Sequence, residues 1–146
     1  MAKKVQSQFS LFLIAWKATP APPVGPMLWQ HWINIGQFTK EFNDKTSDMM
    51  KTFQGFDVRI PVNVTVYIDR SFDMELKTPV STDLIKWKLK LKKWSWEPNK
   101  NKVWTISNDD LKEIAEMKKT DMNTDNIDSI VRSLAGTAKS MGIKVK

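Results

Sequence analysis

The residues best suited to a chemical role in this sequence are lysines and asparagines that alternate near residue 100. Asn99, Lys100, Asn101 and Lys102 directly follow Pro98. Lysine ammonium groups can reach phosphates, and asparagine amides can hydrogen-bond sugars or bases while tolerating unusual backbone angles. A flexible surface loop without a ligand has the same composition. This segment alone therefore leaves both interpretations open.

A second candidate surface lies on a helix predicted to run from about Asn123 or Thr124 to Met141. Apolar residues repeat at helical spacing on one face, which predicts that this face packs in the core: Ile127, Ile130, Val131, Leu134, Ala138 and Met141. The opposite face carries small residues flanked by two cations: Ser129, Ser133, Gly136, Thr137 and Ser140, with Arg132 and Lys139. Small residues let another surface approach the helix backbone, and the cations favour a nucleic-acid backbone. The alternative is a helix–helix contact within an oligomer.

Enzymatic chemistry has no supporting constellation. Cysteine is absent, so the chain has neither disulfides nor thiolate metal sites. The single histidine, His31, has no acid or nucleophile at a readable spacing. The carboxylates Asp109, Asp110 and Glu113 are typical of a helix start. We therefore expect no enzyme, no metal and no cofactor. We also expect no membrane association, because no apolar run of about 18 residues occurs.

The charge of the chain favours a polyanionic partner. The formal net charge is +7, with 9 basic and 7 acidic residues up to Thr78 and 14 basic and 9 acidic residues from Pro79 onward. The basic excess is therefore concentrated in the shorter C-terminal part. Phosphate neutralisation supplies most non-specific affinity for nucleic acids. A solvated basic surface without a partner remains the alternative.

The first part of the chain predicts an α/β domain with a small three-stranded sheet. Val58–Ile68 alternates apolar with polar or mixed residues, and a short turn connects it to a second alternating segment, Phe72–Leu76. Phe9–Ile14 supplies a third strand, and Ile33–Lys45 is predicted to form the intervening helix. Pro61 inside the long strand indicates an edge position or a bulge there.

The second part is predicted to be helical throughout. One helix is predicted from about Ser81 to Leu91, and a loop rich in Lys, Asn and Pro follows over residues 92–106. Ser107 and Asp110 have the spacing of a capping box and begin the next helix. The third helix is the one described above, and Gly142 is its predicted stop. The fold class is therefore α+β, with an α/β domain over residues 1–78 and a three-helix bundle over residues 79–146.

Four prolines in seven residues separate the first predicted strand from the first predicted helix. They are Pro20, Pro22, Pro23 and Pro26. Such a segment is stiff and poor in hydrogen-bond donors. It is either a simple linker or a rigid exposed knob used in recognition.

Several of these segments together resemble one known family over about residues 1–145. The matching motifs are the proline-rich Lys17–Pro26, then Ile60–Val62, Thr65–Tyr67, Asp69–Phe72, Lys77–Pro79, Pro98–Lys100 and Gly136–Gly142. In these motifs the chain is similar to the stalk-base family of the large ribosomal subunit called ribosomal protein L-eleven, in its bacterial type. The resemblance implies a non-catalytic cytoplasmic protein of the ribosome.

The resemblance also implies partners and site residues. The C-terminal domain would bind the GTPase-associated region of large-subunit rRNA through Ser95, Asn99, Lys100, Asn101, Lys102, Arg132, Ser133, Gly136, Thr137, Lys139, Ser140 and Gly142. The N-terminal domain would contact translational GTPases and lie near the stalk anchor protein. Its prolines, Pro20, Pro22, Pro23 and Pro26, would line a cleft for thiopeptide antibiotics. A protein methyltransferase would modify Ala2, Lys4 and Lys40. The other classes that the residues leave open are a non-ribosomal RNA-binding module and a helix-mediated protein–protein module.

Six of the seven tryptophans depart from this family, because they stand where its members have glycine. These are Trp16, Trp29, Trp32, Trp94, Trp96 and Trp104, whereas Trp87 is not at such a position. Glycine serves positive φ or close backbone approach, and tryptophan does neither cheaply. One interpretation is that the indoles, interleaved with lysine, stack on unpaired bases. The other is that UGA was translated as tryptophan although the source organism reads it as glycine. We favour the second because one cause explains all six, and it predicts exposed or poorly packed rings.

Overall fold

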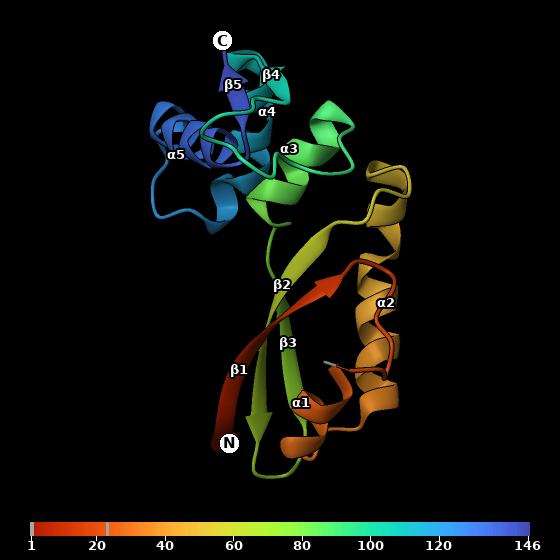
Figure 1. Ribbon diagram of the computed structural model, residues 1–146. Coiled ribbons are helices and arrows are strands. Elements are labelled where there is room, and N and C mark those ends of the chain that lie inside the picture. The colour runs from red at the N-terminus through yellow and green to blue at the C-terminus, as the bar shows by residue number, and fades with distance from the viewer. Residues whose placement is uncertain (1, 23) are drawn as a thin grey trace. The chain divides into compact units, whose positions relative to one another are not determined.

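The chain forms two compact units in a computed structural model that describes residues 2–22 and 24–146 (Figure 1). Contacts divide the chain into unit 1, Met1–Lys77, and unit 2, Thr78–Lys146. Each unit has its own buried core, and each is described by itself. The functions expected of the two parts remain predictions.

Unit 1 is built on a three-stranded antiparallel sheet in the order β1-β2-β3, which confirms the sheet predicted from the sequence. The strands are β1 (Val5–Ile14), β2 (Arg59–Tyr67) and β3 (Phe72–Leu76). Alternation along the strands places one set of side chains on the core face, where they meet two phenylalanines of the long helix: Leu11, Leu13, Ile60, Val62, Val64, Val66, Phe38 and Phe42. Burial of this apolar face fixes the register, because a shift by one residue would expose the whole set.

The expectation that Pro61 marks an edge position or a bulge is wrong, because β2 is the central strand and its pairing around Pro61 is regular. Pro61 pairs with Phe12 of β1, and its carbonyl accepts a hydrogen bond from the Lys77 amide at 3.0 Å. The amide and carbonyl of a strand residue point to the same side. The donor that Pro61 lacks therefore faces β3 just beyond its last residue, Leu76, where the ladder ends and the loss costs least.

Two helices accompany the sheet, one more than the sequence predicted. Helix α2 (Ile35–Thr52) is longer than expected and begins at Asn34, whose side chain accepts a hydrogen bond from the Gln37 amide. The additional helix, α1 (Val24–Gln30), starts inside the proline-rich segment. A helix can begin there because Pro26 lies in its first turn, where a missing amide hydrogen is harmless.

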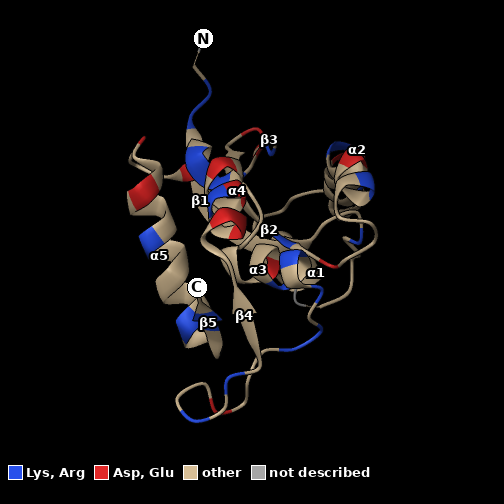
Figure 2. Cartoon of the chain, turned by 90° about the horizontal axis from the view of Figure 1, so that it is seen from above, with Lys and Arg blue, Asp and Glu red and all other residues tan. Residues whose placement is uncertain are grey.

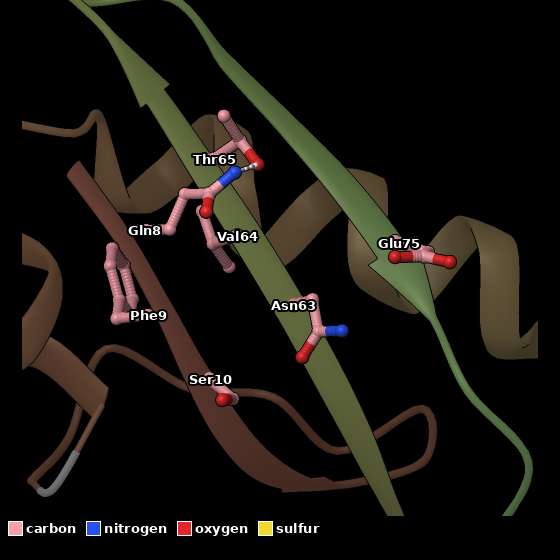
Figure 3. A pocket seen from close by; sticks show the side chains of 7 residues that line it. All are labelled: Gln8, Phe9, Ser10, Asn63, Val64, Thr65 and Glu75. Atoms are coloured by element: carbon pink, nitrogen blue, oxygen red, sulfur yellow. Dashed lines mark hydrogen bonds between the residues drawn. The ribbon is translucent and has the colours of Figure 1, made fainter. Parts of the chain in front are cut away.

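The other face of the sheet is open, and its middle is polar (Figure 3), while Phe12 and Ile14 expose apolar side chains towards the end of β1. Gln8, Ser10, Asn63, Thr65 and Glu75 line a pocket there, and the Gln8 amide nitrogen donates to the Thr65 hydroxyl at 3.3 Å. This polarity matches the alternation of the strands, in which every second side chain points away from the core. The sheet is therefore covered on one face only.

Unit 2 contains three α-helices, a short 3-10 helix and a two-stranded parallel sheet. In chain order these are α3 (Ser81–Leu89), β4 (Trp104–Ile106), α4 (Asn108–Lys118), η1 (Lys119–Asp121), α5 (Ile127–Ser140) and β5 (Ile143–Val145). The expectation of an entirely helical unit is wrong, because β4 pairs with β5. The mixed α+β class is confirmed, whereas a plain three-helix bundle is too simple a description.

Local capping and ion pairing hold the helices of unit 2 in place. The Ser107 hydroxyl accepts a hydrogen bond from the Asp110 amide, as the capping spacing predicted. The Lys88 ammonium joins α3 to α4 by donating to Glu113, and this hydrogen bond raises the pKa of Lys88. Burial lowers the pKa of Lys118, whose Nζ donates to the Pro79 carbonyl at 2.9 Å. None of the described helices is long and apolar enough to cross a membrane.

Candidate nucleic-acid interface

The face of α5 that points away from the core is made of small and basic side chains. Ile130, Leu134 and Ala138 are buried, while Arg132, Ser133, Gly136, Lys139 and Ser140 are exposed. Thr137 is half-buried on the flank of this face. An added Cβ at Gly136 would meet no atom within 4 Å. The middle of this helix is therefore open to close approach by another surface.

Two of the hydroxyl groups on this face bond back to their own helix. The Thr137 hydroxyl donates to the Ser133 carbonyl at 3.3 Å, and the Ser140 hydroxyl donates to the Thr137 carbonyl at 2.6 Å. Such bonds satisfy the hydroxyl hydrogens and leave the oxygen lone pairs free to accept. They also hold the side chains close to the helix, so the face stays flat. A flat face with exposed oxygens suits sugar hydroxyls, which can donate to them.

The loop that follows α3 packs against the C-terminal end of α5. The Ser95 amide donates to the Met141 carbonyl at 3.0 Å, and the Val103 amide donates to the Gly142 carbonyl at 2.9 Å. The Ser95 hydroxyl donates to the Asn101 carbonyl at 2.7 Å and closes the loop. The structure thus brings together two segments that the sequence analysis singled out separately.

Two of the predicted RNA contacts, Ser95 and Gly142, are buried. Ser95 is only 5% exposed, and Gly142 lies against it. Both residues therefore help to hold the loop against the end of α5. Gly142 has φ +79°, and an added Cβ would lie 2.4 Å from the Ser95 Cβ and 3.1 Å from the Asn101 carbonyl oxygen. Glycine is required there both by the backbone conformation and by the close approach.

Replacing Gly142 with alanine is expected to lower the free energy of unfolding of unit 2 by at least about 2 kcal/mol. The loss arises because alanine is strained in the left-handed conformation and because its Cβ would clash with Ser95. Urea unfolding of the full chain measures this loss. Gly136→Ala is the matched control, since its Cβ enters open space and should stabilise the helix by about 0.5–1 kcal/mol. Equal stability of Gly142→Ala and the parent chain would show that the loop does not depend on this contact.

The four alternating residues lie exposed in the loop that Ser95 closes. These are Asn99, Lys100, Asn101 and Lys102, and the amides of Lys100 and Asn101 both donate to the Glu97 carbonyl. The Lys102 ammonium donates to the Pro98 carbonyl at 2.6 Å, so this side chain also bridges its own loop. Lys100 has no such bond among the described residues and presents its charge to solvent.

Free positive charge is concentrated in the loops of unit 2 and is sparse on α5. Figure 2 shows the segment before β4 with several basic positions and α5 mostly uncharged. Within the described chain, Lys100, Arg132 and Lys139 form no ion pair. Pairing would reduce their attraction for phosphate, so these cations remain available for a polyanion. The described part of the chain contains no group of three or more His, Asp or Glu side chains that could hold a metal ion.

A pocket beside the buried Ser95 was not predicted as a site. It is lined by Lys86, Lys92, Lys93, Trp94 and Trp96, and the Lys86 ammonium lies 5.0 Å from the Trp94 ring centroid. The run of two lysines before Trp94 is the sequence signal that could have indicated it. Lys86 pairs with Asp83 at 3.0 Å, so the pocket adds two cations that are unpaired among the described residues, Lys92 and Lys93, next to the loop.

The residues predicted in unit 1 lie on its surface wherever the structure describes them. Pro20, Pro22 and Pro26 are exposed, and Pro23 lies outside the described residues. The proline segment turns sharply: an added Cβ at Gly25 would lie 2.3 Å from the Pro20 carbonyl oxygen. The three residues expected to be methylated, Ala2, Lys4 and Lys40, are also exposed. Exposure makes these side chains accessible to partners.

Comparison with known proteins gives matches over both units. A family model described as "Ribosomal protein L11, N-terminal domain" matches residues 9–72, and one described as "Ribosomal protein L11, RNA binding domain" matches residues 77–145. The chain belongs to the ribosomal protein L11 family. A curated relative, "Large ribosomal subunit protein uL11" of Hydrogenobaculum sp. (strain Y04AAS1), is 45% identical over 146 residues, covering 100% of this chain and 97% of the relative.

Membership in the L11 family confirms the resemblance found in the motifs. The family consists of structural constituents of the large ribosomal subunit, so the chain is a ribosomal protein and no enzyme. Its RNA-binding domain falls on residues 77–145, which include α5 and the loop that packs against it. The match identifies the domain that binds RNA. It does not identify the side chains within it.

Proposed function

We propose that unit 2 binds the GTPase-associated region of large-subunit rRNA through the exposed face of α5 and the loop around Lys100. The observation that carries this proposal is the bonding of the loop to the C-terminal end of α5, from Ser95 to Met141 and from Val103 to Gly142. It joins the flat small-residue face to the free lysine in one surface. The three helices and the β4–β5 pair act as the frame that holds this surface.

Unit 1 is proposed to act as the docking part of the protein. Translational GTPases and the stalk anchor protein are its proposed partners, and the exposed prolines Pro20, Pro22 and Pro26 are proposed to line a cleft for thiopeptide antibiotics. Modification of Ala2, Lys4 and Lys40 by a protein methyltransferase is proposed as well. Support for these roles comes from the family motifs and from the exposure of the side chains.

Replacing Lys100 with glutamine is expected to reduce the salt dependence of RNA binding. Loss of one phosphate contact should lower the slope of log affinity against log salt by about 0.7–0.9. Lys102→Gln should lower it similarly and also loosen the loop, because Lys102 bonds the Pro98 carbonyl. Titration of the full chain with a fragment of large-subunit RNA at several salt concentrations measures both effects.

Lys112→Gln is the matched control, since Lys112 is an exposed lysine of α4 that faces Asp109 and lies outside the proposed surface. It should leave the slope unchanged. An equal change in the salt slope for Lys100→Gln and Lys112→Gln would show that the loop around Lys100 is not the RNA interface. Association of the protein with itself, unaffected by salt, would instead favour the helix-mediated protein–protein module, because small-residue packing responds little to ionic strength.

A further inference from the structure

Beyond the register shift between Val5 and Ser7, the free edge of β1 lacks the usual protection of an edge strand. β1 is ten residues long, lies at one edge of the sheet and contains no charged residue. The opposite edge, β3, has five residues and carries Asp73 and Glu75. Natural proteins shorten or charge their edge strands because an exposed edge is a template for pairing with another chain. β3 follows this rule and β1 does not.

The hydrogen-bond register identifies which groups of β1 remain free. The Pro61 carbonyl faces β3, so the pair of Phe12 and Pro61 exchanges no hydrogen bonds. Phe9, Leu11 and Leu13 therefore bond β2, and the amides and carbonyls of Gln8, Ser10 and Phe12 point outward. Among the described residues, none of these outward groups has a hydrogen-bond partner beyond the sheet.

An apolar groove runs beside this edge. It is lined by β1 and by two side chains of α1: Ser10, Leu11, Phe12, Leu13, Val24 and Met27. Phe12 is 67% exposed and Met27 is 37% exposed. Unpaired main-chain groups at every second residue, next to an apolar groove, are the features that bind an extended peptide by strand addition.

Charge at the start of β1 determines the chemistry of the occupant. Lys3 and Lys4 precede the strand and Lys17 follows it. Lys3 pairs with Asp69 at 3.4 Å and Lys17 pairs with Asp57 at 2.5 Å, whereas Lys4 forms no ion pair among the described residues. A second copy of β1 brings no carboxylate to Lys4, because residues 1–17 contain no acidic residue. A foreign strand with an uncharged centre and a carboxylate at the end that meets Lys4 would complement this edge.

We propose that the β1 edge binds an extended segment of a partner protein, uncharged over about five residues and acidic at the end that meets Lys4, as an added strand. The partner takes hydrogen bonds from Gln8, Ser10 and Phe12 and packs its apolar side chains against Phe12 and Met27. This interaction is independent of RNA binding by unit 2, so either one can fail without the other.

The test follows amide hydrogen exchange in the full chain by NMR, with and without a synthetic peptide of alternating valine and threonine flanked by glutamates. The amides of Gln8, Ser10 and Phe12 should exchange at least tenfold more slowly when the peptide is bound. Those of Phe9, Leu11 and Leu13 are already bonded within the sheet and should change little. A peptide flanked by lysines is the charge control and should bind at least tenfold more weakly.

Ser10→Pro removes one outward amide without touching the bonds to β2, and should weaken peptide binding at least tenfold. Ser10→Ala keeps the amide and should bind like the parent chain. Phe12→Lys is a second disrupting variant in case Ser10→Pro distorts the strand. Unchanged exchange with saturating peptide would overturn the proposal. Protection that depends on protein concentration alone would show that a second copy occupies the edge. Protection by an RNA fragment alone would show that RNA occupies it. Either result also overturns the proposal.

Discussion

Replacing Gly136 with phenylalanine is expected to weaken RNA binding at least tenfold, which corresponds to about 1.4 kcal/mol, while the free protein stays folded. Gly136 is exposed in the middle of α5, and an added side chain meets no atom within 4 Å. The ring would therefore project from a flat face and hold RNA away from the backbone and from the flanking Arg132 and Lys139. Binding of the full chain to a large-subunit RNA fragment and urea unfolding measure the two effects separately.

Gly136→Ala is the control for this experiment, because a methyl group barely changes the face. It should bind RNA nearly as the parent chain does and unfold at a higher urea concentration, since alanine is favoured over glycine inside a helix. Tight RNA binding by Gly136→Phe would show that this face of α5 is not the interface. Unfolding of Gly136→Phe would instead show that the open space beside Gly136 is needed by the protein itself.

The native cellular protein is expected to carry glycine at positions 16, 29, 32, 94, 96 and 104. The structure confirms the expected exposure for five of the six rings: Trp29, Trp32, Trp94, Trp96 and Trp104 are exposed, and Trp96 is 98% exposed. Trp16 is half-buried, and both Trp16 (φ 53°) and Trp32 (φ 58°) adopt the left-handed conformation that favours glycine. Backbone strain supports glycine at these two positions, and ring exposure supports it at the other four.

Mass spectrometry of peptides from the native protein tests this prediction directly at each position. Peptide masses calculated with glycine should match the measured ones. Masses that match tryptophan would contradict recoding. They would also make the pocket of Lys86, Lys92 and Lys93 beside Trp94 and Trp96 the place to look for base stacking. The peptide that contains position 87 is informative too, because Trp87 lies inside helix α3 and is not one of the six positions expected to be glycine.

Stability measurements on the protein made with tryptophan give an independent check. Trp32→Gly should raise the free energy of unfolding by about 1 kcal/mol, since left-handed strain costs about 1–2 kcal/mol per residue. The Arg70 guanidinium lies 5.8 Å from the Trp32 ring, and at an exposed site this contact offsets only part of the gain. Trp29→Gly is the control and should lower stability by about 0.5–1 kcal/mol, because Trp29 lies within helix α1. Destabilisation by both changes would mean that position 32 accommodates the indole.

Local pattern was enough to predict the elements whose residues repeat with a clear period. Alternation over Val58–Ile68 predicted β2, and the serine–aspartate spacing at Ser107 predicted the start of α4. The apolar stripe of α5 identified its buried face, and the opposite face followed as the candidate surface. These features succeed because hydrophobic period and capping depend on neighbours in the chain.

Only the tertiary structure decided the features that depend on distant residues. Strands β4 and β5 have three residues each, too few for a period, and they pair across nearly forty positions of sequence. The local signal of Pro61 indicated an edge position or a bulge, yet β2 is the central strand. A proline is tolerated there because the ladder with β3 ends at the point where the proline lacks its donor.

The sequence also did not predict which residues of the proposed RNA site are buried and which face solvent. The amino-acid sequence by itself singled out the small residues on α5 and the lysines near residue 100 as two separate candidate surfaces. The fold decided that Ser95 and Gly142 are buried and join the two segments, while Gly136 and Lys100 face solvent. A serine and a glycine carry no local signal for burial, because burial is set by what packs on them from elsewhere in the chain.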